Sequence, residues 1–393
     1  MDAKQKITVL YDAAEDTEKA KAEKDGKPFP LAYAQVTEAL EKRGHAVHAI
    51  AVNKKIRTLV NVIEKDDSDV IFNLCEAIAS STQHEHNVVG LLELFEKCFT
   101  GSGSAGWLLA GDKALCKKIF QFHGIRYPRF CTVAKGRVDW SDELDFPLIV
   151  KPLQEDASIG IDNNSVVHNI KELLERISYI HEEFGGATLV EEFIEGREIY
   201  VGVMGNRDPV ALPILEWDFS KIKEGPKIAG AEAKWDRESE AFHAPEVFPE
   251  DIPPDIVKGI QEAALTAYQA LKLTGYARVD MRLRRKDVAT RKPKANKASS
   301  KSEGETKVED AASKGANGKK KELENAVDPR DDKPASAEGD WDYPIIEVNP
   351  NCWIEKRSEF AMAARKQGMN YPELLERIID LARQRRPQAK NVD

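Results

Sequence analysis

Two short motifs far apart in the chain place carboxylates at a spacing that suits a metal site. Arg278 and Asp280 alternate in one apolar run, and Glu347 and Asn349 alternate in another. Alternate residues of a β-strand share a face, so pairing the two runs as the arms of a hairpin sets Asp280 about opposite Glu347. A few hard oxygen ligands that leave room for water and phosphate oxygens suit Mg²⁺ bridging the phosphates of a nucleotide. The alternative is an ordinary exposed face that carries salt bridges.

Lysines at the ends of predicted elements form a second candidate. An apolar strand delivers Lys151, and the loop that follows contains Ser158 and Gly160. Such a loop can fold its backbone N–H groups over phosphate while the lysine neutralises charge, although the Walker A pattern is absent. Lys113 and Lys117, at i and i+4 near the start of a helix, can reach the same side. The common alternative for these lysines is a solvated charge.

A third candidate is a strand that breaks at Gly196 and resumes at Glu198. Backbone groups of a connecting segment often hold adenine, and a nearby carboxylate can accept hydrogen bonds from the ribose hydroxyls. The residues before the break are Glu191, Glu192, Phe193 and Ile194. A β-turn with charged flanks is the alternative.

Alternating strands and helices are predicted to position these side chains. The first part of the chain predicts strands at 7–11, 46–52 and 69–74 and helices at 31–42, 56–64 and 88–98. Such alternation indicates an α/β fold with a small parallel sheet and helices on both faces. The remainder predicts helices at 112–123, 170–183, 254–273, 359–367 and 371–383, and strands at 130–133, 146–151, 187–193, 198–204, 209–215, 276–283 and 343–348.

The stretch from Arg284 to Asp340 differs in composition from the rest. It is dominated by Lys, Ala, Glu, Ser, Asp and Gly and has almost no large apolar residue. Such a segment cannot bury enough apolar surface to offset its ordering entropy. We therefore expect a disordered, low-complexity insertion in the hairpin.

Composition excludes several classes of protein. The 393 residues include 58 Lys and Arg against 67 Asp and Glu, and this acidic balance gives no support for a nucleic-acid partner. No apolar run reaches the roughly 18 residues of a membrane helix, so no membrane partner is expected. Five scattered cysteines without a C-x-x-C pair argue against a disulfide framework or a zinc knuckle and favour the cytoplasm.

The order and spacing of the motifs resemble the ATP-grasp superfamily, and within it most of all the D-alanine-D-alanine ligase family. The resemblance runs from about Asp69 to Leu381, interrupted by the insertion. The motifs that carry it are Asp112-Lys113, Ile149 to Pro152, Glu191 to Ile194 with Glu198, Lys234, Arg278 to Asp280, and Glu347 to Pro350.

This resemblance implies an ATP-grasp fold of three subdomains, an N-terminal parallel α/β sheet and two lobes that clamp ATP. It implies an N-terminal α/β domain at 1–107, a central subdomain at 108–190, and a C-terminal subdomain at 191–386 that the insertion at 285–340 interrupts. The α/β organisation would give way to α+β in the C-terminal part.

The resemblance also implies roles for the site residues. Lys113 and Lys151 would contact the phosphates, Glu191 to Ile194 would hold adenine, and Glu198 would bind ribose. The loop with Ser158 and Gly160 would complete the nucleotide site. Two Mg²⁺ ions, with Mn²⁺ as the alternative metal, would be held by Asp280, Glu347 and Asn349.

Catalysis in the resembling family implies three further residues. Arg278 would stabilise the tetrahedral intermediate, and Ser358 aligns with a substrate-contacting serine. Lys234 would face the γ-phosphate from a mobile loop at 221–245, whose alternative is a plain surface connection.

Departures from the family concentrate where substrate would bind. The stretch from Tyr11 to Asp16 lacks the family's Gly-rich match, Ala157 stands in place of a serine, and Trp235 in place of a frequent tyrosine. The run from Asn351 to Ser358 lacks the usual Pro-Gly. We therefore expect a ligase whose substrates are not two D-alanines.

The leading hypothesis is a cytoplasmic ligase that uses ATP and Mg²⁺ to join a carboxylate, that of an amino acid or short peptide, to an amine through an acyl phosphate. Its partners would be these small molecules, and the resemblance allows a homodimer. One alternative is a genuine D-alanine-D-alanine ligase of cell-wall synthesis. Another is a non-catalytic nucleotide-binding or interaction protein.

Overall fold

The structure is a computed structural model that describes residues 4–17, 31–53, 55–75, 84–135, 137–140, 143–155, 158–222, 225–236, 239–285 and 341–385. These residues form three β-sheets with helices packed on them. The predicted insertion, apart from Arg284 and Arg285, lies outside the described residues, as does Ala157.

The N-terminal sheet is parallel, as the sequence predicts. Its order is β2 (Ala46–Val52), β1 (Lys6–Asp12), β3 (Val70–Asn73). In β1, Ile7 and Val9 face a core shared with α2 (Ala32–Lys42), whereas Leu10 faces α3 (Ile56–Lys65) and α4 (Glu85–Leu94). Period-2 alternation thus buries both faces of the sheet. Helix α4 starts at Glu85, before the predicted start at residue 88. It ends at Leu94 and not at the predicted residue 98, because Glu96 adopts a left-handed φ of 51° that the helix cannot continue through.

Two helices connect this sheet to the next one. Helix α6 (Lys113–Phe122) follows the prediction: the Asp112 side chain caps it by accepting hydrogen bonds from two backbone N–H groups, and Gly124 follows with φ 67°. Helix α5 (Ser104–Gly111) was not predicted. Its sequence, SAGWLLAG, has no polar face, so no amphipathic period reveals it.

The central sheet is antiparallel, with the order β5-β4-β8-β6-β7. Helix α7 (Ile170–Glu183) packs Ile180 against it and has the predicted bounds, and Asn169 caps its first turn. The strands are β4 (Phe130–Ala134), β5 (Arg137–Trp140), β6 (Leu148–Pro152), β7 (Val166–Val167) and β8 (Thr188–Glu192).

The third sheet has the order β12-β11-β9-β13-β14, with β10 paired to β9 and β15 paired to β13. Its strands are β9 (Arg197–Met204), β10 (Val210–Ala211), β11 (Leu215–Trp217), β12 (Glu246–Val247), β13 (Tyr276–Arg285), β14 (Trp341–Asp342) and β15 (Ile345–Asn349). The single strand predicted at 209–215 is wrong: it divides into β10 and β11 around Pro213, which has no N–H to donate to a ladder.

Helices of the C-terminal part cover this sheet. Helix α9 (Pro254–Ala270) buries Ile256, Ile260 and Ala264, and α11 (Glu359–Lys366) brings Phe360 against β9. A Cβ on Gly202 would approach the Phe360 ring to 3.0 Å, so only glycine permits this packing. The remaining helices are the short α8 (Ala231–Trp235) and the C-terminal α12 (Tyr371–Arg385).

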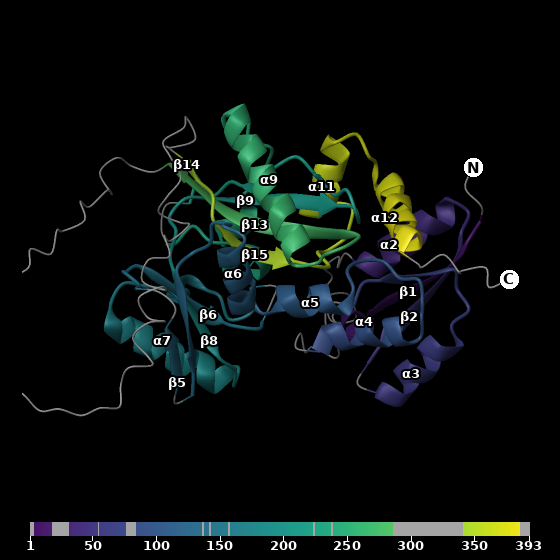
Figure 1. Cartoon of the computed structure of the whole chain (residues 1–393), viewed down its shortest axis with the longest axis horizontal. Coiled ribbons are helices and arrows are strands. Elements are labelled where there is room, and N and C mark those ends of the chain that lie inside the picture. Colours follow the sequence, from purple (N-terminus) through teal and green to yellow (C-terminus); the bar gives the residue numbers. More distant parts are fainter. Residues whose placement is uncertain are drawn as a thin grey trace, which may run out of the picture.

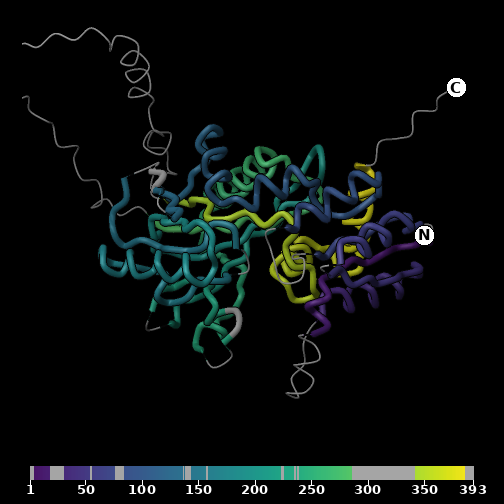
Figure 2. Tube along the Cα trace, turned by 90° about the horizontal axis from the view of Figure 1, so that it is seen from below, coloured from purple at the N-terminus to yellow at the C-terminus, as the bar shows by residue number. Residues whose placement is uncertain are grey.

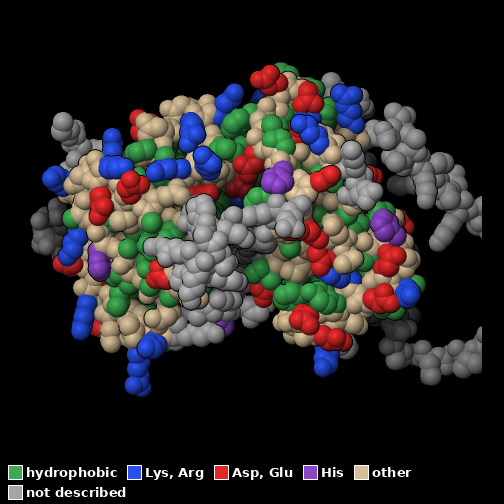
Figure 3. Space-filling view, turned by 180° about the vertical axis from the view of Figure 1, so that it is seen from behind, with side chains coloured by type: hydrophobic (Ala, Val, Ile, Leu, Met, Phe, Trp, Pro, Cys, Tyr) green, Lys and Arg blue, Asp and Glu red, His purple; other side chains and the backbone are tan. Residues whose placement is uncertain are grey.

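The three sheets lie side by side, with the third sheet between the other two (Figure 1). Helix α12 lies beside α2, so the last described helix completes the layer that covers the first sheet (Figures 1 and 2). On the face seen in Figure 3, basic and acidic side chains are interspersed.

Deleting 292–333 and joining the ends through a short Gly-Ser linker should leave ATP binding intact. β13 pairs with β14 at Arg284↔Asp342 and Arg285↔Trp341, so the chain leaves and re-enters the fold at neighbouring strand ends. Loop-closure entropy changes slowly with loop length, so the free energy of unfolding should shift by no more than about 1–2 kcal/mol. Urea unfolding and nucleotide titration measure both quantities, and loss of folding would contradict the interpretation as an insertion.

Candidate functional site

The predicted metal ligands meet on the β13–β15 hairpin. The register pairs Asp280 with Glu347 and Arg278 with Asn349, which confirms the predicted opposition of the two carboxylates. The Asn349 amide donates to Asp280 Oδ2 at 3.0 Å. Asp280, Glu347 and Asn349 together offer two carboxylates and one amide oxygen. Among the described residues, no group of three or more His, Cys, Asp or Glu side chains is arranged to hold a metal ion. These hard donors fit Mg²⁺, which retains several water ligands and phosphate oxygens.

Arg278 lies beside these ligands. Its Nε and Nη2 contact the two oxygens of Asp280 at 2.8 and 2.9 Å, and its Nη1 lies 3.4 Å from Glu359. Its guanidinium also lies over the Tyr200 ring, 5.0 Å from the centroid. Burial opposes the charge, but Asp280 and Glu359 outweigh it and hold the pKa of Arg278 well above its ordinary value. Arg278 is therefore a fixed cation next to the predicted metal site.

The three candidate lysines are buried, so the alternative of solvated charges is wrong for them. Lys113, Lys117 and Lys151 are 3%, 1% and 5% exposed. Lys113 pairs with Glu347 at 2.9 Å, which connects α6 to β15, the strand that carries two of the predicted metal ligands. Buried ammonium groups require anionic partners, and a polyphosphate is one such partner.

Glu191 holds two of these lysines, from α6 and β6. Its oxygens lie 2.6 Å from Lys117 Nζ and 2.7 Å from Lys151 Nζ. Lys117 also donates to the Ile346 carbonyl at 3.2 Å, next to Glu347. Burial lowers the pKa of Lys117. Burial alone would raise the pKa of Glu191, but the two ammonium groups outweigh it and lower that pKa.

Glu198, the predicted ribose ligand, is buried at the start of β9. It accepts a hydrogen bond from the Tyr200 hydroxyl at 2.9 Å and pairs with Arg282 at 3.0 Å. Sequence reasoning missed Arg282, although it continues the alternation of Arg278 and Asp280 along the same face of β13.

Many predicted nucleotide residues line one cavity between the second and third sheets. Its lining includes Lys151, Ser158, Glu191, Glu192, Phe193, Ile194, Glu198, Asp280, Arg282 and Glu347, together with Ile228 and Ala229 of the segment before α8. The Ser158 hydroxyl donates to the Ala229 carbonyl at 2.6 Å. Gly160 has φ 72°, and a Cβ there would approach Pro152 and Phe184 to within 2.9 Å, so the loop requires glycine at this position.

Two predicted catalytic residues lie differently. Lys234 belongs to α8, but its side chain lies outside the described part of the chain. Ser358 caps α11: its hydroxyl donates to the Glu355 carbonyl at 2.9 Å and accepts from the Ala361 N–H at 3.4 Å. A substrate contact for either residue stays a prediction.

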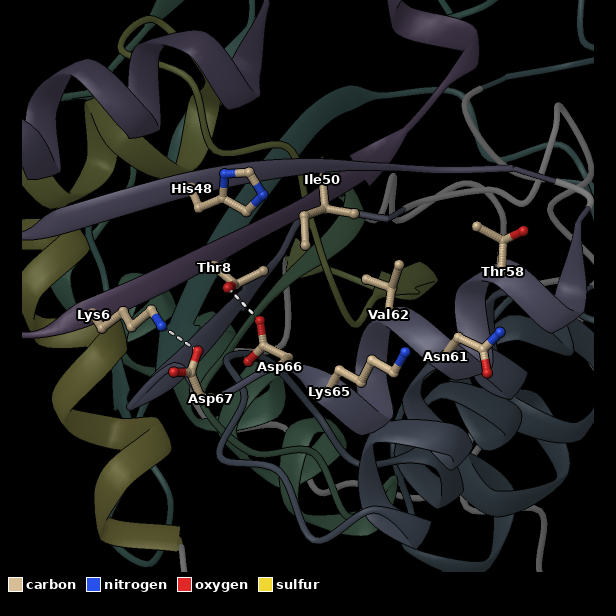
Figure 4. A pocket seen from close by; sticks show the side chains of 10 residues that line it. All are labelled: Lys6, Thr8, His48, Ile50, Thr58, Asn61, Val62, Lys65, Asp66 and Asp67. Atoms are coloured by element: carbon tan, nitrogen blue, oxygen red, sulfur yellow. Dashed lines mark hydrogen bonds and ion pairs between the residues drawn. The ribbon is translucent and has the colours of Figure 1, made fainter.

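A wider groove lies on the N-terminal sheet, away from these residues (Figure 4). Its acidic side chains already have partners: Asp67 pairs with Lys6, and Asp66 accepts from Thr8 at 2.5 Å. None of the predicted site residues lines it, whereas many of them line the smaller cavity.

Replacing Glu246 with Gln should make stability less sensitive to pH. Burial, Glu359 and Glu355 raise the pKa of Glu246 from 4.5 to about 8, with Arg278 as a partial offset. Between those pH values the folded protein binds more protons than the unfolded chain, so this group's contribution to stability falls as pH rises and then levels off. The free energy of unfolding of the variant minus that of wild type should be about 1–3 kcal/mol more positive at pH 9 than at pH 5. Urea unfolding at both pH values checks this, with the exposed Glu262→Gln as control; an equal difference at both pH values would contradict it.

Known proteins with similar sequences identify the family. The model of the D-ala D-ala ligase C-terminus matches residues 119–290. A D-alanine-D-alanine ligase from Syntrophotalea carbinolica is 32% identical over 247 residues, which cover 62% of this chain and 73% of that protein. The chain belongs to the D-alanine-D-alanine ligase family. Another D-alanine-D-alanine ligase, from Desulforudis audaxviator, is 28% identical over 89% of this chain and 92% of that protein.

Solved structures agree with the fold of the D-alanine-D-alanine ligase family. The crystal structure of the Bacillus anthracis D-alanine-D-alanine ligase complexed with ATP aligns with a TM-score of 0.62 and 20% identity, covering 97% of this chain and 98% of that chain. The predicted ATP-grasp fold, with its N-terminal parallel sheet, is thereby confirmed. As a member of this family the protein is an ATP-using ligase that forms carbon–nitrogen bonds. None of the described helices combines the length and the apolar composition that a membrane span requires.

Proposed function

We propose that this protein is a Mg²⁺- and ATP-dependent ligase that joins the carboxylate of an amino acid or short peptide to an amine through an acyl phosphate. The observation that carries the proposal is the burial of Lys113, Lys117 and Lys151 beside the carboxylates of Glu191 and Glu347. Of these residues, Lys151, Glu191 and Glu347 line one cavity. A buried ammonium group that lines a cavity, with two more buried ammonium groups behind the same carboxylates, favours a polyphosphate ligand over a neutral one.

In this proposal the chain binds the nucleotide between its second and third sheets. Lys113, Lys151 and the loop with Ser158 and Gly160 hold phosphates, Glu191 to Ile194 hold adenine, and Glu198 binds ribose. Asp280, Glu347 and Asn349 hold two Mg²⁺ ions, or Mn²⁺ in their place. When bound, the metal neutralises phosphate charge and favours transfer of the γ-phosphoryl group.

The protein itself supplies no nucleophile. The substrate carboxylate attacks the γ-phosphorus and releases ADP, and the amine then attacks the acyl carbon and releases phosphate. Arg278, which contacts Asp280 and Glu359, would stabilise the oxyanion of that second step. Lys234 would neutralise the γ-phosphate, and Ser358 would contact substrate through the first turn of α11.

We propose the three subdomains at 1–107, 108–190 and 191–386 as the units that clamp ATP. The five cysteines are buried and form no disulfide among the described residues, which supports a cytoplasmic location. A homodimer remains part of the proposal by family resemblance alone.

A phosphate-release screen of the purified protein with ATP, Mg²⁺, amino acids and dipeptides tests the function. Release that depends on an amino acid or dipeptide other than D-alanine supports the proposal. Strict dependence on D-alanine would favour the cell-wall ligase, which the altered residues around the substrate region make the weaker candidate. No substrate-dependent release, together with ATP binding, would favour the non-catalytic alternative.

A further inference from the structure

Arg282 joins three segments around the candidate nucleotide cavity. It lies on β13 directly opposite Glu198 of β9 and is only 5% exposed. Its Nη2 pairs with Glu198 Oε2 at 3.0 Å, and its Nη1 donates to the carbonyls of Gly196 at 3.2 Å and Lys227 at 2.8 Å. One guanidinium thus binds the turn after the adenine segment, the predicted ribose carboxylate, and the segment before α8.

Glu198 keeps acceptor capacity while Arg282 holds it. Its Oε1 accepts from the Tyr200 hydroxyl, and its Oε2 accepts from Arg282 and from the Ala229 N–H at 3.2 Å. A carboxylate offers about four acceptor positions. Among described residues these three contacts leave one position on Oε1, so Glu198 can accept a ribose hydroxyl without releasing Arg282.

The segment Lys227–Ala231 connects this cluster to the opposite side of the cavity. The Ala229 carbonyl accepts from the Ser158 hydroxyl at 2.6 Å, and the Ala231 N–H donates to the Ile161 carbonyl at 2.8 Å. Ile228 and Ala229 line the cavity between these two anchors. The position of this cavity wall therefore depends on the Arg282–Glu198 pair at one end and on the Ser158 loop at the other.

We propose that Arg282 is a positioning residue that couples ribose recognition by Glu198 to closure of the segment Lys227–Ala231 over the nucleotide. The inference rests on the proposed function, in which Glu198 accepts from ribose. Arginine suits this role because its planar fork reaches several acceptors in fixed directions, whereas a lysine ammonium is a single point charge.

Nucleotide binding by wild type and by Arg282→Met tests the coupling without relying on turnover. Titration compares ATP with dideoxy-ATP, which lacks both ribose hydroxyls. Wild type should prefer ATP by about tenfold, the usual worth of a hydrogen bond to a charged group, and Arg282→Met should lose most of that preference. Inorganic triphosphate should bind both proteins equally, because Lys113 and Lys151 remain in place.

Hydrogen exchange provides the second readout. ATP should protect the amides of 227–231 in wild type, and dideoxy-ATP should protect them less. In Arg282→Met the two nucleotides should give equal, weak protection. A purely structural ion pair would lower both affinities by the same factor and leave their ratio unchanged.

Arg282→Lys and Arg285→Met complete the design. A lysine at this position retains the charge but reaches fewer acceptors, so the preference of Arg282→Lys for ATP over dideoxy-ATP should be intermediate. If Arg282→Met does not fold, the result for Arg282→Lys decides the question. Arg285 lies on the same strand and stacks on Trp341 at 4.9 Å, so Arg285→Met should keep the wild-type preference.

The outcomes separate the two proposals. Absence of ATP binding in wild type would overturn the proposed function. Normal ATP binding with full ribose discrimination in both Arg282 variants would overturn the coupling alone. Wild type that binds ATP and dideoxy-ATP equally would also overturn it, because Glu198 would then not read the ribose.

Discussion

Replacing Glu347 by Gln is expected to lower turnover by a factor on the order of 10³ or more. The substitution removes one of two carboxylates from the proposed metal site and changes little in shape. Lys113 keeps its hydrogen bond to the Glu155 carbonyl at 2.7 Å, so the free energy of unfolding should fall by no more than about 1–3 kcal/mol. Phosphate release at rising Mg²⁺ concentration measures the first effect, and urea unfolding the second.

The control is Glu376→Gln, which removes a carboxylate of similar exposure, paired with Arg43 and His45, far from the cavity. Asp280→Asn is the less informative variant. The alternative of an ordinary exposed face does not hold for Asp280, which is only 5% exposed. Asp280 neutralises the buried Arg278, so its loss also weakens the fold. Wild-type turnover in Glu347→Gln would rule out its role as a metal ligand.

Glu191→Gln should destabilise the protein by about 3–5 kcal/mol, because it leaves the buried ammonium groups of Lys117 and Lys151 without their shared carboxylate. Lys117→Met should cost less, about 1–2 kcal/mol, because it leaves Glu191 and Lys151 as a neutral pair. Adding Lys117→Met to Glu191→Gln should then restore part of the lost stability. Urea unfolding of the three variants at pH 7 measures this order.

Glu192→Gln is the matched control for this series. Glu192 is the next residue, partly exposed, and pairs with Arg129 and Arg284, which are about a third exposed. Its loss should cost no more than about 1 kcal/mol. Two outcomes would show that Glu191 does not act by balancing charge. Either Glu191→Gln and Lys117→Met would lower the free energy of unfolding equally, or the double variant would lose the sum of the two single losses.

Local patterns predicted much of the site. The opposition of Asp280 and Glu347 follows from two alternating runs and the assumption of a hairpin, because backbone pairing is periodic and the insertion does not alter it. The bounds of α6 likewise follow from Asp112 as a cap and Gly124 beyond the last turn, both of which act within a few residues.

Contacts between distant segments could not be predicted in this way. Nothing near Lys117 in sequence specifies Glu191, and nothing near Arg282 specifies Glu198 or the Lys227 carbonyl. These pairs depend on how the sheets pack, and a buried arginine has the same local pattern as an exposed one. The sequence therefore indicated the types of side chain at the site without their partners.

The shared core of α2 and α12 has a consequence for the order in which the chain can fold during synthesis. Val36 and Leu40 of α2 pack in the same cluster as Leu374 and Ile378 of α12, which follows the second and third sheets in the chain. The ribosome makes proteins from the N-terminus, and helices bury their apolar faces only when the partner is present. The N-terminal sheet thus emerges before the other two sheets, yet that side of its core is completed only after both of them and α12 have been translated.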